Sequence, residues 1–269
     1  MQEIITKILS RAPKEILNQS LGSISNMTLM ELQTKVEENK VESFNAEEGS
    51  LTGYDCPLCK NRGWIAFIRD GQMAVSECQC MNKRRLTRNL ERSGLSSLLD
   101  DYTFAKYKTE REWQKSAKEK AIEFAERGQG WFVITGTPGT GKTHLCTAIC
   151  CSFLDRGKDV RYMLWRDDAP RLKALVNDRE LYEEQMNSFK DADVLYIDDF
   201  WKGNITEADI NLSFELLNSR YNDRKKITII SGEKDVEQIL EIDEAIGSRI
   251  YEKSKGYLIK TPAENYRLR

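Results

Sequence analysis

Long apolar runs and histidine are both scarce in this sequence. The longest mainly apolar run, Leu145 to Leu154, is far shorter than the roughly 20 residues that a membrane-spanning helix needs. The first residues also lack the pattern of a signal peptide. We therefore expect a soluble, cytoplasmic protein without a membrane partner. The single histidine, His144, is expected on a helix surface or at an interface rather than in a ligand set.

Net charge is nearly absent from the whole chain, yet charge is unevenly distributed along it. The 269 residues carry a formal net charge of −2. Residues 1–50 hold 5 basic and 8 acidic side chains, whereas residues 81–120 hold 11 basic and 6 acidic ones. This asymmetry indicates that the two parts contact different partners. The length is sufficient for one full α/β domain and a smaller appendage.

One stretch, GTPGTGKT, fits the phosphate-binding pattern G-x-x-x-x-G-K-[ST] at every position. A buried strand is predicted just before it at residues 131–135, and a helix just after it. Such a glycine-rich turn directs backbone N–H groups and the positive end of the helix at a phosphate. We expect Lys142 to reach the β- and γ-phosphates of ATP and Thr143 to bind Mg²⁺. The predicted nucleotide-binding residues of this loop are Gly136, Thr137, Pro138, Gly139, Thr140, Gly141, Lys142 and Thr143.

A second apolar strand, predicted at residues 194–197, ends in two carboxylates, Asp198 and Asp199. After a P-loop this arrangement is typical of a Walker B motif. Asp198 is expected to hold Mg²⁺ through its water shell, and Asp199 to orient the attacking water. Further strands are predicted at residues 160–165, 227–231 and 257–259. Strands that alternate with helices predict a parallel sheet with helices on both faces and the nucleotide at the carboxyl ends.

Four of the seven cysteines form two close pairs with 18 residues between them. The intervening residues predict a β-hairpin that turns at Asp70-Gly71, which would bring the pairs together around one Zn²⁺. Four thiolates close the coordination sphere, so a structural role is expected; a disulfide framework is the alternative. The predicted ligands are Cys56, Cys59, Cys78 and Cys80. The remaining three are expected to be small buried hydrophobes on the P-loop helix: Cys146, Cys150 and Cys151.

Helical segments are predicted on both sides of this cysteine module. Residues 1–50 place apolar side chains at helical spacing, including Met27, Met30, Leu32 and Val36. They either pack on their own neighbours or present a partner-binding face. Residues 82–92 read NKRRLTRNLER and form either a solvated face or a patch that contacts phosphates. The candidate nucleic-acid contacts are Lys83, Arg84, Arg85 and Arg88.

We divide the chain into four predicted parts. Residues 1–50 are a helical partner-binding region and residues 51–81 a zinc-binding module. Residues 82–100 are a basic linker helix, and residues 101–269 are an ATPase domain.

Together these motifs resemble those of the AAA+ ATPases of the DnaC/DnaI type, the bacterial and phage loaders of replicative helicases. The resemblance covers most of the chain and rests on the cysteine module, GTPGTGKTHL, LYIDDFWKGNITEADIN and IGSRI. It implies an AAA+ core that self-assembles, shares ATP between subunits and contacts single-stranded DNA. It also implies that the amino-terminal region grips a hexameric helicase. Arg249 resembles the arginine finger of these proteins and Ser231 their sensor-1 position.

Two features depart from a generic AAA+ enzyme. Many of these ATPases carry glutamate at the position of Asp199, so the shorter side chain implies slow hydrolysis. Only 20 residues follow Arg249, from which we expect no carboxyl-terminal lid domain. Two other functions remain open: an IstB-type transposition helper ATPase, and a zinc-dependent nucleic-acid-binding adaptor with weak ATPase activity. An intrachain salt bridge is the alternative role for Arg249.

Overall fold

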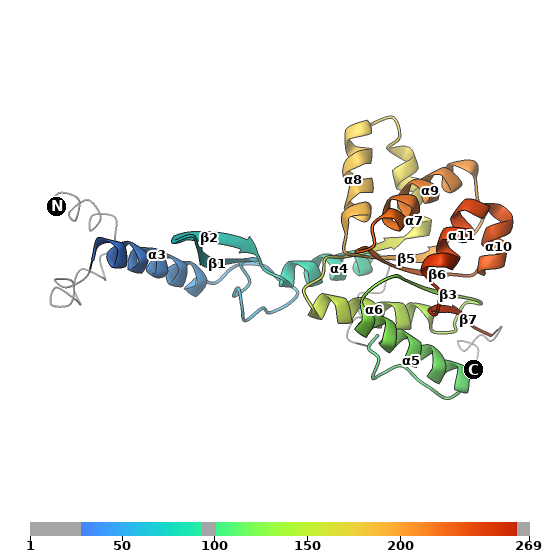
Figure 1. The fold of residues 1–269 in the computed structure, drawn as a ribbon, viewed down its shortest axis with the longest axis horizontal. Coiled ribbons are helices and arrows are strands. Elements are labelled where there is room, and N and C mark those ends of the chain that lie inside the picture. The colour runs from blue at the N-terminus through green and yellow to red at the C-terminus, as the bar shows by residue number, and fades with distance from the viewer. Residues whose placement is uncertain (1–27, 93–100, 263–269) are drawn as a thin grey trace. The chain divides into compact units, whose positions relative to one another are not determined.

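The computed structural model describes residues 28–92 and 101–262 (Figure 1). The chain divides into two compact units at the junction of Met81 and Asn82. Within the described residues, none of the helices has the length and apolar character needed to span a membrane. Of the apolar positions named in residues 1–50, Met27 lies outside the described part.

The first unit contains a helix and a two-stranded hairpin. Helix α3, Leu29–Ala46, begins with a capping box in which Thr28 and Glu31 bond each other's backbone N–H. The hairpin pairs β1, Trp64–Arg69, with β2, Gln72–Glu77. Its turn residues Asp70 and Gly71 have φ values of 51° and 77°. Both values are positive, as a two-residue hairpin turn of this twist requires, so the predicted turn is confirmed.

Side chains of α3 complete both open edges of this hairpin. Asn45 accepts the N–H of Ala66 and donates to its carbonyl, each at 2.9 Å. Glu37 accepts the N–H of Met73, also at 2.9 Å. These bonds satisfy backbone groups that an isolated hairpin leaves exposed. The predicted apolar stripe is only partly packed, because Met30 is 78% exposed.

The second unit is built on a five-stranded parallel sheet in the order β4-β5-β6-β3-β7. The strands are apolar throughout the middle of the sheet, as expected where both faces are covered by helices. Their bounds are β3 Trp131–Thr135, β4 Val160–Leu164, β5 Val194–Phe200, β6 Ile227–Gly232 and β7 Leu258–Lys260. The last strand therefore begins one residue later than predicted. The parallel α/β sheet expected from the sequence is confirmed.

Helices lie on both faces of the sheet (Figure 1). Alternate residues of each strand point to opposite faces. In β3, Phe132 and Ile134 pack in the core beneath α5 and α6, whereas Trp131 and Val133 pack in the core beneath the later helices. The helix bounds are α4 Cys80–Arg92, α5 Glu112–Arg127, α6 Lys142–Asp155, α7 Trp165–Ala174, α8 Arg179–Asp191, α9 Glu207–Asn222, α10 Val236–Ile242 and α11 Glu244–Lys253.

Strand β6 separates the P-loop strand β3 from the aspartate-bearing strand β5. Gly232 at the end of β6 is in register with Thr135 on one side and with Phe200 on the other. The carboxyl ends of three strands therefore meet at one edge of the sheet, where the predicted nucleotide site lies.

Candidate functional site

The predicted phosphate loop connects β3 to α6 and is folded tightly against neighbouring chain. Gly136 has φ 132°, and a Cβ there would lie 2.2 Å from Thr261 Oγ1. Gly141, at the start of α6, has φ 85°, and its Cβ would lie 3.0 Å from the ring of Tyr107. Both positions therefore require glycine for conformation and for space.

The residues that follow β7 lie directly on this loop. Thr261 donates its backbone N–H to Thr135 at 2.8 Å, and its hydroxyl bonds that of Thr140 at 3.2 Å. The hydroxyl of Thr137 donates to the carbonyl of Pro262 at 3.4 Å. The loop is thus held on one side by the end of the described chain.

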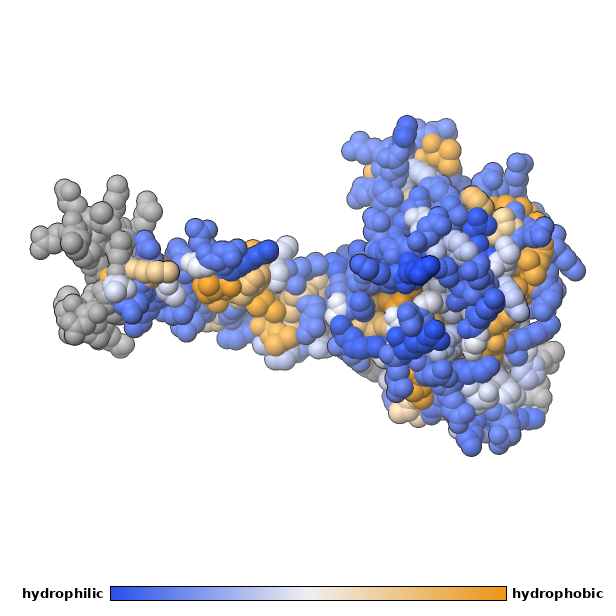
Figure 2. Space-filling view, viewed as in Figure 1, coloured by the Kyte–Doolittle hydropathy of each residue, from blue (hydrophilic) through white to orange (hydrophobic). Residues whose placement is uncertain are grey.

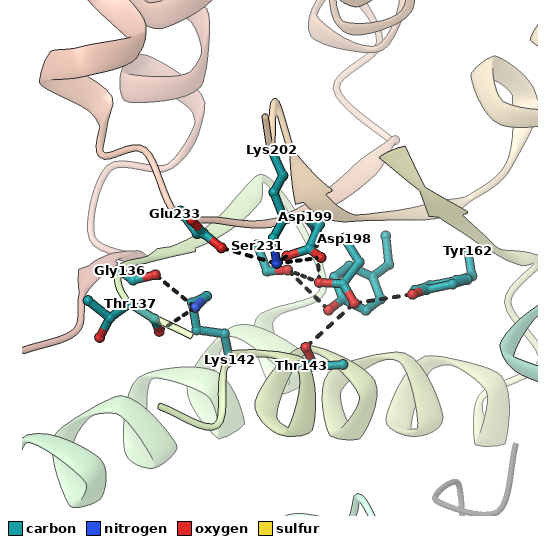
Figure 3. A network of polar contacts seen from close by, with 11 residues as sticks. Gly136, Thr137, Lys142, Thr143, Tyr162, Asp198, Asp199, Lys202, Ser231 and Glu233 are labelled. Carbon is teal, nitrogen blue, oxygen red and sulfur yellow. Dashed lines mark hydrogen bonds and ion pairs between the residues drawn. The ribbon is translucent and has the colours of Figure 1, made fainter. Parts of the chain in front are cut away.

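Lys142 lies in the middle of this site (Figure 3). Its ammonium group donates to the carbonyl oxygens of Gly136 and Thr137, each at 2.8 Å. Burial lowers the pKa of Lys142, and the carboxylates of Asp199, Glu233 and Asp198 oppose that shift. A buried cation within a loop of backbone N–H groups is suited to bind a phosphate.

Asp198 is buried and surrounded by hydroxyl groups (Figure 3). Its Oδ2 lies 3.5 Å from Thr143 Oγ1 and accepts the phenol of Tyr162 at 3.1 Å, while its Oδ1 accepts the hydroxyl of Ser231. Burial raises the pKa of Asp198, the bond from Ser231 lowers it, and the neighbouring charge of Asp199 raises it further. A desolvated carboxylate beside a threonine hydroxyl offers the hard oxygen ligands that fit Mg²⁺.

Asp199 occupies a different environment from Asp198. It has φ 54°, in the left-handed region, and its carboxylate lies 3.1 Å from the ammonium of Lys202. The same ammonium lies 3.0 Å from Glu233 at the end of β6. Burial lowers the pKa of Lys202, but hydrogen bonds to Glu233 and Asp199 more than offset this, so the net shift is upward. Lys202 therefore stays charged at neutral pH and fixes the direction of Asp199.

Three of these residues were not predicted from the sequence: Tyr162, Lys202 and Glu233. Lys202 and Glu233 belong to different segments, and only the adjacency of β5 and β6 brings them together. Glu233 lies two residues after the predicted end of its strand. This position was the one feature of the sequence that could have indicated a role for Glu233 in the site. Ser231 is buried as expected for a strand-end residue, and its hydroxyl also lies 3.2 Å from that of Tyr196.

A hollow of about 430 Å³ adjoins the loop on the side of the chain that precedes α5. His144 forms part of its wall, donates Nε2–H to the carbonyl of Thr103 at 2.9 Å and stacks on Tyr102. Half-burial of the ring lowers the pKa of His144. The imidazole is therefore used in packing the segment before α5 against α6. The hollow is lined by Lys106, Tyr107, Lys108, Glu110, Gln114, Gly139, Thr140, Gly141 and His144.

Arg249 lies within α11. Its Nε donates to Asn218 Oδ1 at 3.2 Å and its Nη1 to the carbonyl of Ala245 at 2.7 Å. The guanidinium also lies 5.0 Å from the ring centre of Phe214. None of the ion pairs seen among the described residues includes Arg249, so they do not support the alternative of an intrachain salt bridge.

The four predicted zinc ligands converge in the first unit. All four thiols are buried and their sulfur atoms lie within 4.8 Å of one another. The sulfurs of Cys56 and Cys78 are 3.8 Å apart and those of Cys59 and Cys80 are 3.5 Å apart. Zn–S bonds of about 2.3 Å place tetrahedral ligands about 3.8 Å apart, which these separations fit. The cysteines are free thiols, so the alternative of a disulfide framework is not supported.

A backbone N–H beside Cys59 favours the ionised form of that sulfur, whereas burial raises the pKa of Cys78. The N–H of Gly63 points at the sulfur of Cys59 at 3.4 Å. Burial alone would raise the pKa of Cys59, but this N–H and the neighbouring thiols lower it to about 7. A thiol that ionises near neutral pH is the form that binds a metal ion. The arrangement therefore fits Zn²⁺ as a structural ion.

Two of the cysteines on α6, Cys146 and Cys150, are buried in the core as predicted, whereas Cys151 is half-buried.

The basic side chains of α4 have unequal environments. Arg85 lies 3.7 Å from Asp159 and also donates to Asn82, so part of its charge is engaged within the second unit. Lys83 and Arg84 are half-buried, and Arg88 is exposed. Of the four predicted nucleic-acid contacts, Arg88 is therefore the most accessible.

Comparison with known proteins gives a consistent set of relatives. The family model described as IstB-like ATP binding protein matches residues 68–269. The phage-like element PBSX protein XkdC of Bacillus subtilis is 31% identical over 236 residues, which cover 82% of this chain and 87% of that protein. The replicative helicase loader DnaC of Escherichia coli is 35% identical over 119 residues, covering 43% of this chain and 49% of DnaC.

Solved structures agree on the fold of the second unit. A crystal structure of the DnaC helicase loader superposes with a TM-score of 0.52 at 20% identity, over 61% of this chain and 97% of that chain. AMPPCP-bound DnaA from Aquifex aeolicus superposes with a TM-score of 0.52 at 26% identity, over 61% and 51% of the two chains. The second unit thus has the fold of an AAA+ ATPase domain.

Proposed function

The chain belongs to the family of IstB-like ATP binding proteins, and on this basis we propose that it is an ATP-dependent loader of a replicative DNA helicase. In this role it binds the helicase and delivers it to single-stranded DNA, with ATP as the switch. The observation that carries the proposal is the pairing of Thr143 with buried Asp198 beside Lys142. The similarity to DnaC, a protein named as a replicative helicase loader, supports the choice of partner.

ATP would lie along the loop at the carboxyl edge of the sheet. Loop N–H groups and Lys142 would hold its phosphates, and Thr143 and Asp198 would hold Mg²⁺, which neutralises phosphate charge when bound. The hollow beside Gly141 would receive the base. Asp199 would accept a hydrogen bond from the attacking water. Lys202 fixes Asp199 in a short ion pair, and with an aspartate in place of glutamate we expect slow turnover.

Arg249 would act on the nucleotide of a neighbouring subunit. A guanidinium can bridge two phosphate oxygens and is always charged, which suits the charge that develops during phosphoryl transfer. The contacts of Arg249 with Asn218 and Ala245 would hold it on the face formed by α9 and α11. On this proposal a complete catalytic site requires self-assembly.

The hairpin of the zinc module would add to the helicase contact that the sequence predicts for residues 1–50. This hairpin exposes large apolar side chains, including Trp64 at 49% and Val75 at 49%. They lie on one face of the hairpin. Val75 pairs with Ala66 and so shares its face, and Trp64 lies two residues from Ala66 on the same strand, which puts it on that face too. Apolar surface is visible over this unit in Figure 2. Apolar groups that remain exposed on a small module are suited to bury against a partner protein.

Two measurements on the full chain test the proposal. The wild-type protein is expected to turn over ATP, faster with single-stranded DNA present, and Lys142→Ala is expected to abolish turnover. A replicative helicase hexamer should be retained by the wild type and lost from Trp64→Ser/Val75→Ser. The matched control is Arg69→Ser, which changes an exposed residue of the same hairpin.

The outcomes separate the candidate functions. The family's name favours one second candidate, a transposition helper ATPase of the IstB type, whose partner would be a transposase. Retention of a transposase but not of a helicase would favour that candidate. Turnover no greater than that of Lys142→Ala would favour a nucleic-acid-binding adaptor with a structural nucleotide site. Helicase retention by Trp64→Ser/Val75→Ser at the wild-type level would refute the hairpin as part of the contact.

A further inference from the structure

A hollow of about 210 Å³ with a basic lining lies in the ATPase unit, at the end of the sheet where three strands begin. Gly130 directly precedes β3, Arg224 precedes β6, and Tyr257 precedes β7. We call it the rear pocket. Its lining residues are Arg127, Gln129, Gly130, Arg224, Lys253, Lys255 and Tyr257.

The rear pocket is separate from the nucleotide site. The phosphate loop follows the carboxyl end of β3, whereas Gly130 lies at the amino end of the same strand. Six residue steps at about 3.3 Å each put Gly130 about 20 Å from Gly136 in the loop. The sheet itself lies between the two sites, so one ligand of phosphate size cannot occupy both.

The cations of the rear pocket have few competing partners. None of the ion pairs found among the described residues includes Arg127, Arg224, Lys253 or Lys255. Arg127 lies 5.6 Å from the ring centre of Tyr257, and Lys253 lies 4.6 Å from that of Tyr221. None of the described residues that line the pocket is acidic.

Three carboxylates near this region accept hydrogen bonds from neutral donors. Glu123 accepts the phenol of Tyr257 at 2.9 Å, and Glu252 accepts that of Tyr221 at 2.8 Å. Asp223, which precedes Arg224, accepts the N–H of Lys225. None of these bonds joins a carboxylate to a lining cation, so the guanidinium and ammonium groups of the pocket keep N–H donors available for a ligand.

Helix capping accounts for only part of this charge. Helices α5, α9 and α11 end at Arg127, Asn222 and Lys253, within two residues of pocket-lining cations. Each helix end carries about −0.5 charge, so three ends offer about −1.5. The four lining cations outnumber the three helix ends beside them. Their N–H groups can therefore donate to an anionic ligand as well as to the helix ends.

We propose that the rear pocket binds phosphate groups. Two arginines offer forked N–H donors that match phosphate oxygens, and two lysines add mobile ammonium groups. Tyr257 is buried, and its ring packs on Phe124, so it cannot stack on a nucleobase. Binding is therefore independent of base sequence. The phosphates come either from the backbone of a nucleic-acid strand or from free phosphate, and this inference does not depend on the loader proposal.

The test compares two variants of equal charge in the full chain, with ATP saturating the P-loop. Arg224→Ala/Lys255→Ala removes two exposed cations of the pocket. Lys115→Ala/Lys225→Ala removes two exposed cations outside it. The first probe is the salt dependence of affinity for a labelled 20-nucleotide thymidine strand, and the second is calorimetric titration with inorganic pyrophosphate.

If the pocket holds a strand, the pocket variant lowers the slope of log affinity against log salt by about 1.4, two contacts at about 0.7 each. The loss of affinity between 50 and 200 mM salt then becomes about sevenfold smaller. If it holds free phosphate, strand binding is unchanged and pyrophosphate binding is lost in the pocket variant alone. If the pocket variant and the control variant have the same salt slope for the strand and the same affinity for pyrophosphate, the proposal is wrong. Unchanged ATP binding verifies that the pocket variant is folded.

Discussion

Asp198 and Asp199 are adjacent in sequence but differ in their chemistry. Asp198 is buried among hydroxyl groups from Thr143, Tyr162 and Ser231, and no cation of the described residues lies at hydrogen-bond distance from it. Asp199 is half-buried and is paired with Lys202. The first environment is suited to a metal ion and the second to a polarised water molecule. Substituting each in turn should therefore produce different defects.

We expect Asp198→Asn to weaken Mg²⁺-dependent nucleotide binding by about 10- to 100-fold, as for groups that support a metal through its water shell. Asp199→Asn should leave nucleotide affinity unchanged and lower turnover by about 10²- to 10⁴-fold, because only the orientation of water is lost. Fluorescent-nucleotide titration and phosphate release measure the two quantities. An equal loss of binding in both variants would mean that Asp199 also supports the metal.

At the scale of elements, the sequence was most informative where structure is local. The P-loop, the strand before it and the hairpin turn at Asp70-Gly71 depend on short-range backbone preferences, and all three are found as predicted. The bridge from Asp199 through Lys202 to Glu233 depends on β6 lying beside β5. Strand order is decided by long-range packing, which spacing along one sequence does not encode. The rear pocket was missed for the same reason.

The zinc module is the element whose stability depends most on a single feature. With few residues to form a core, its four sulfurs replace apolar packing, and structural Zn²⁺ supplies about 10–16 kcal/mol in comparable small modules. Purified protein should contain about one Zn per chain. Cys59→Ser should unfold residues 51–81 while nucleotide binding by the second unit persists.

Metal analysis and limited proteolysis read out this change. Cys151→Ser is the matched control, since Cys151 lies on α6 and not in the cluster. Freshly purified, reduced protein without zinc would contradict the assignment.

At the scale of the whole molecule, the proposal for Arg249 requires more than one copy of the chain. Arg249→Ala should leave ATP affinity nearly unchanged and lower turnover by about 10³-fold, the lower end of the range measured for arginine fingers. Mixing Arg249→Ala with Lys142→Ala should restore part of the activity. In the mixture, an intact P-loop from one variant meets an intact Arg249 from the other.

Phosphate release from the two variants, alone and mixed, measures this rescue. Co-assembly is verified separately by analytical ultracentrifugation. A mixture that co-assembles but remains inactive would mean that Arg249 acts within its own subunit and not on its neighbour.

The contact of Thr261 and Pro262 with the phosphate loop makes the chain after β7 a reporter of the nucleotide. Thr261 bonds Thr140, and Thr137 bonds Pro262, so occupation of the loop and the position of this segment are energetically linked. Linkage is reciprocal: whatever factor a nucleotide applies to the affinity of a ligand for this segment, that ligand applies to the nucleotide. An affinity tag or antibody that shifts this segment would thus shift the nucleotide affinity measured in its presence. The same property lets a dye on this segment report ATP binding in real time.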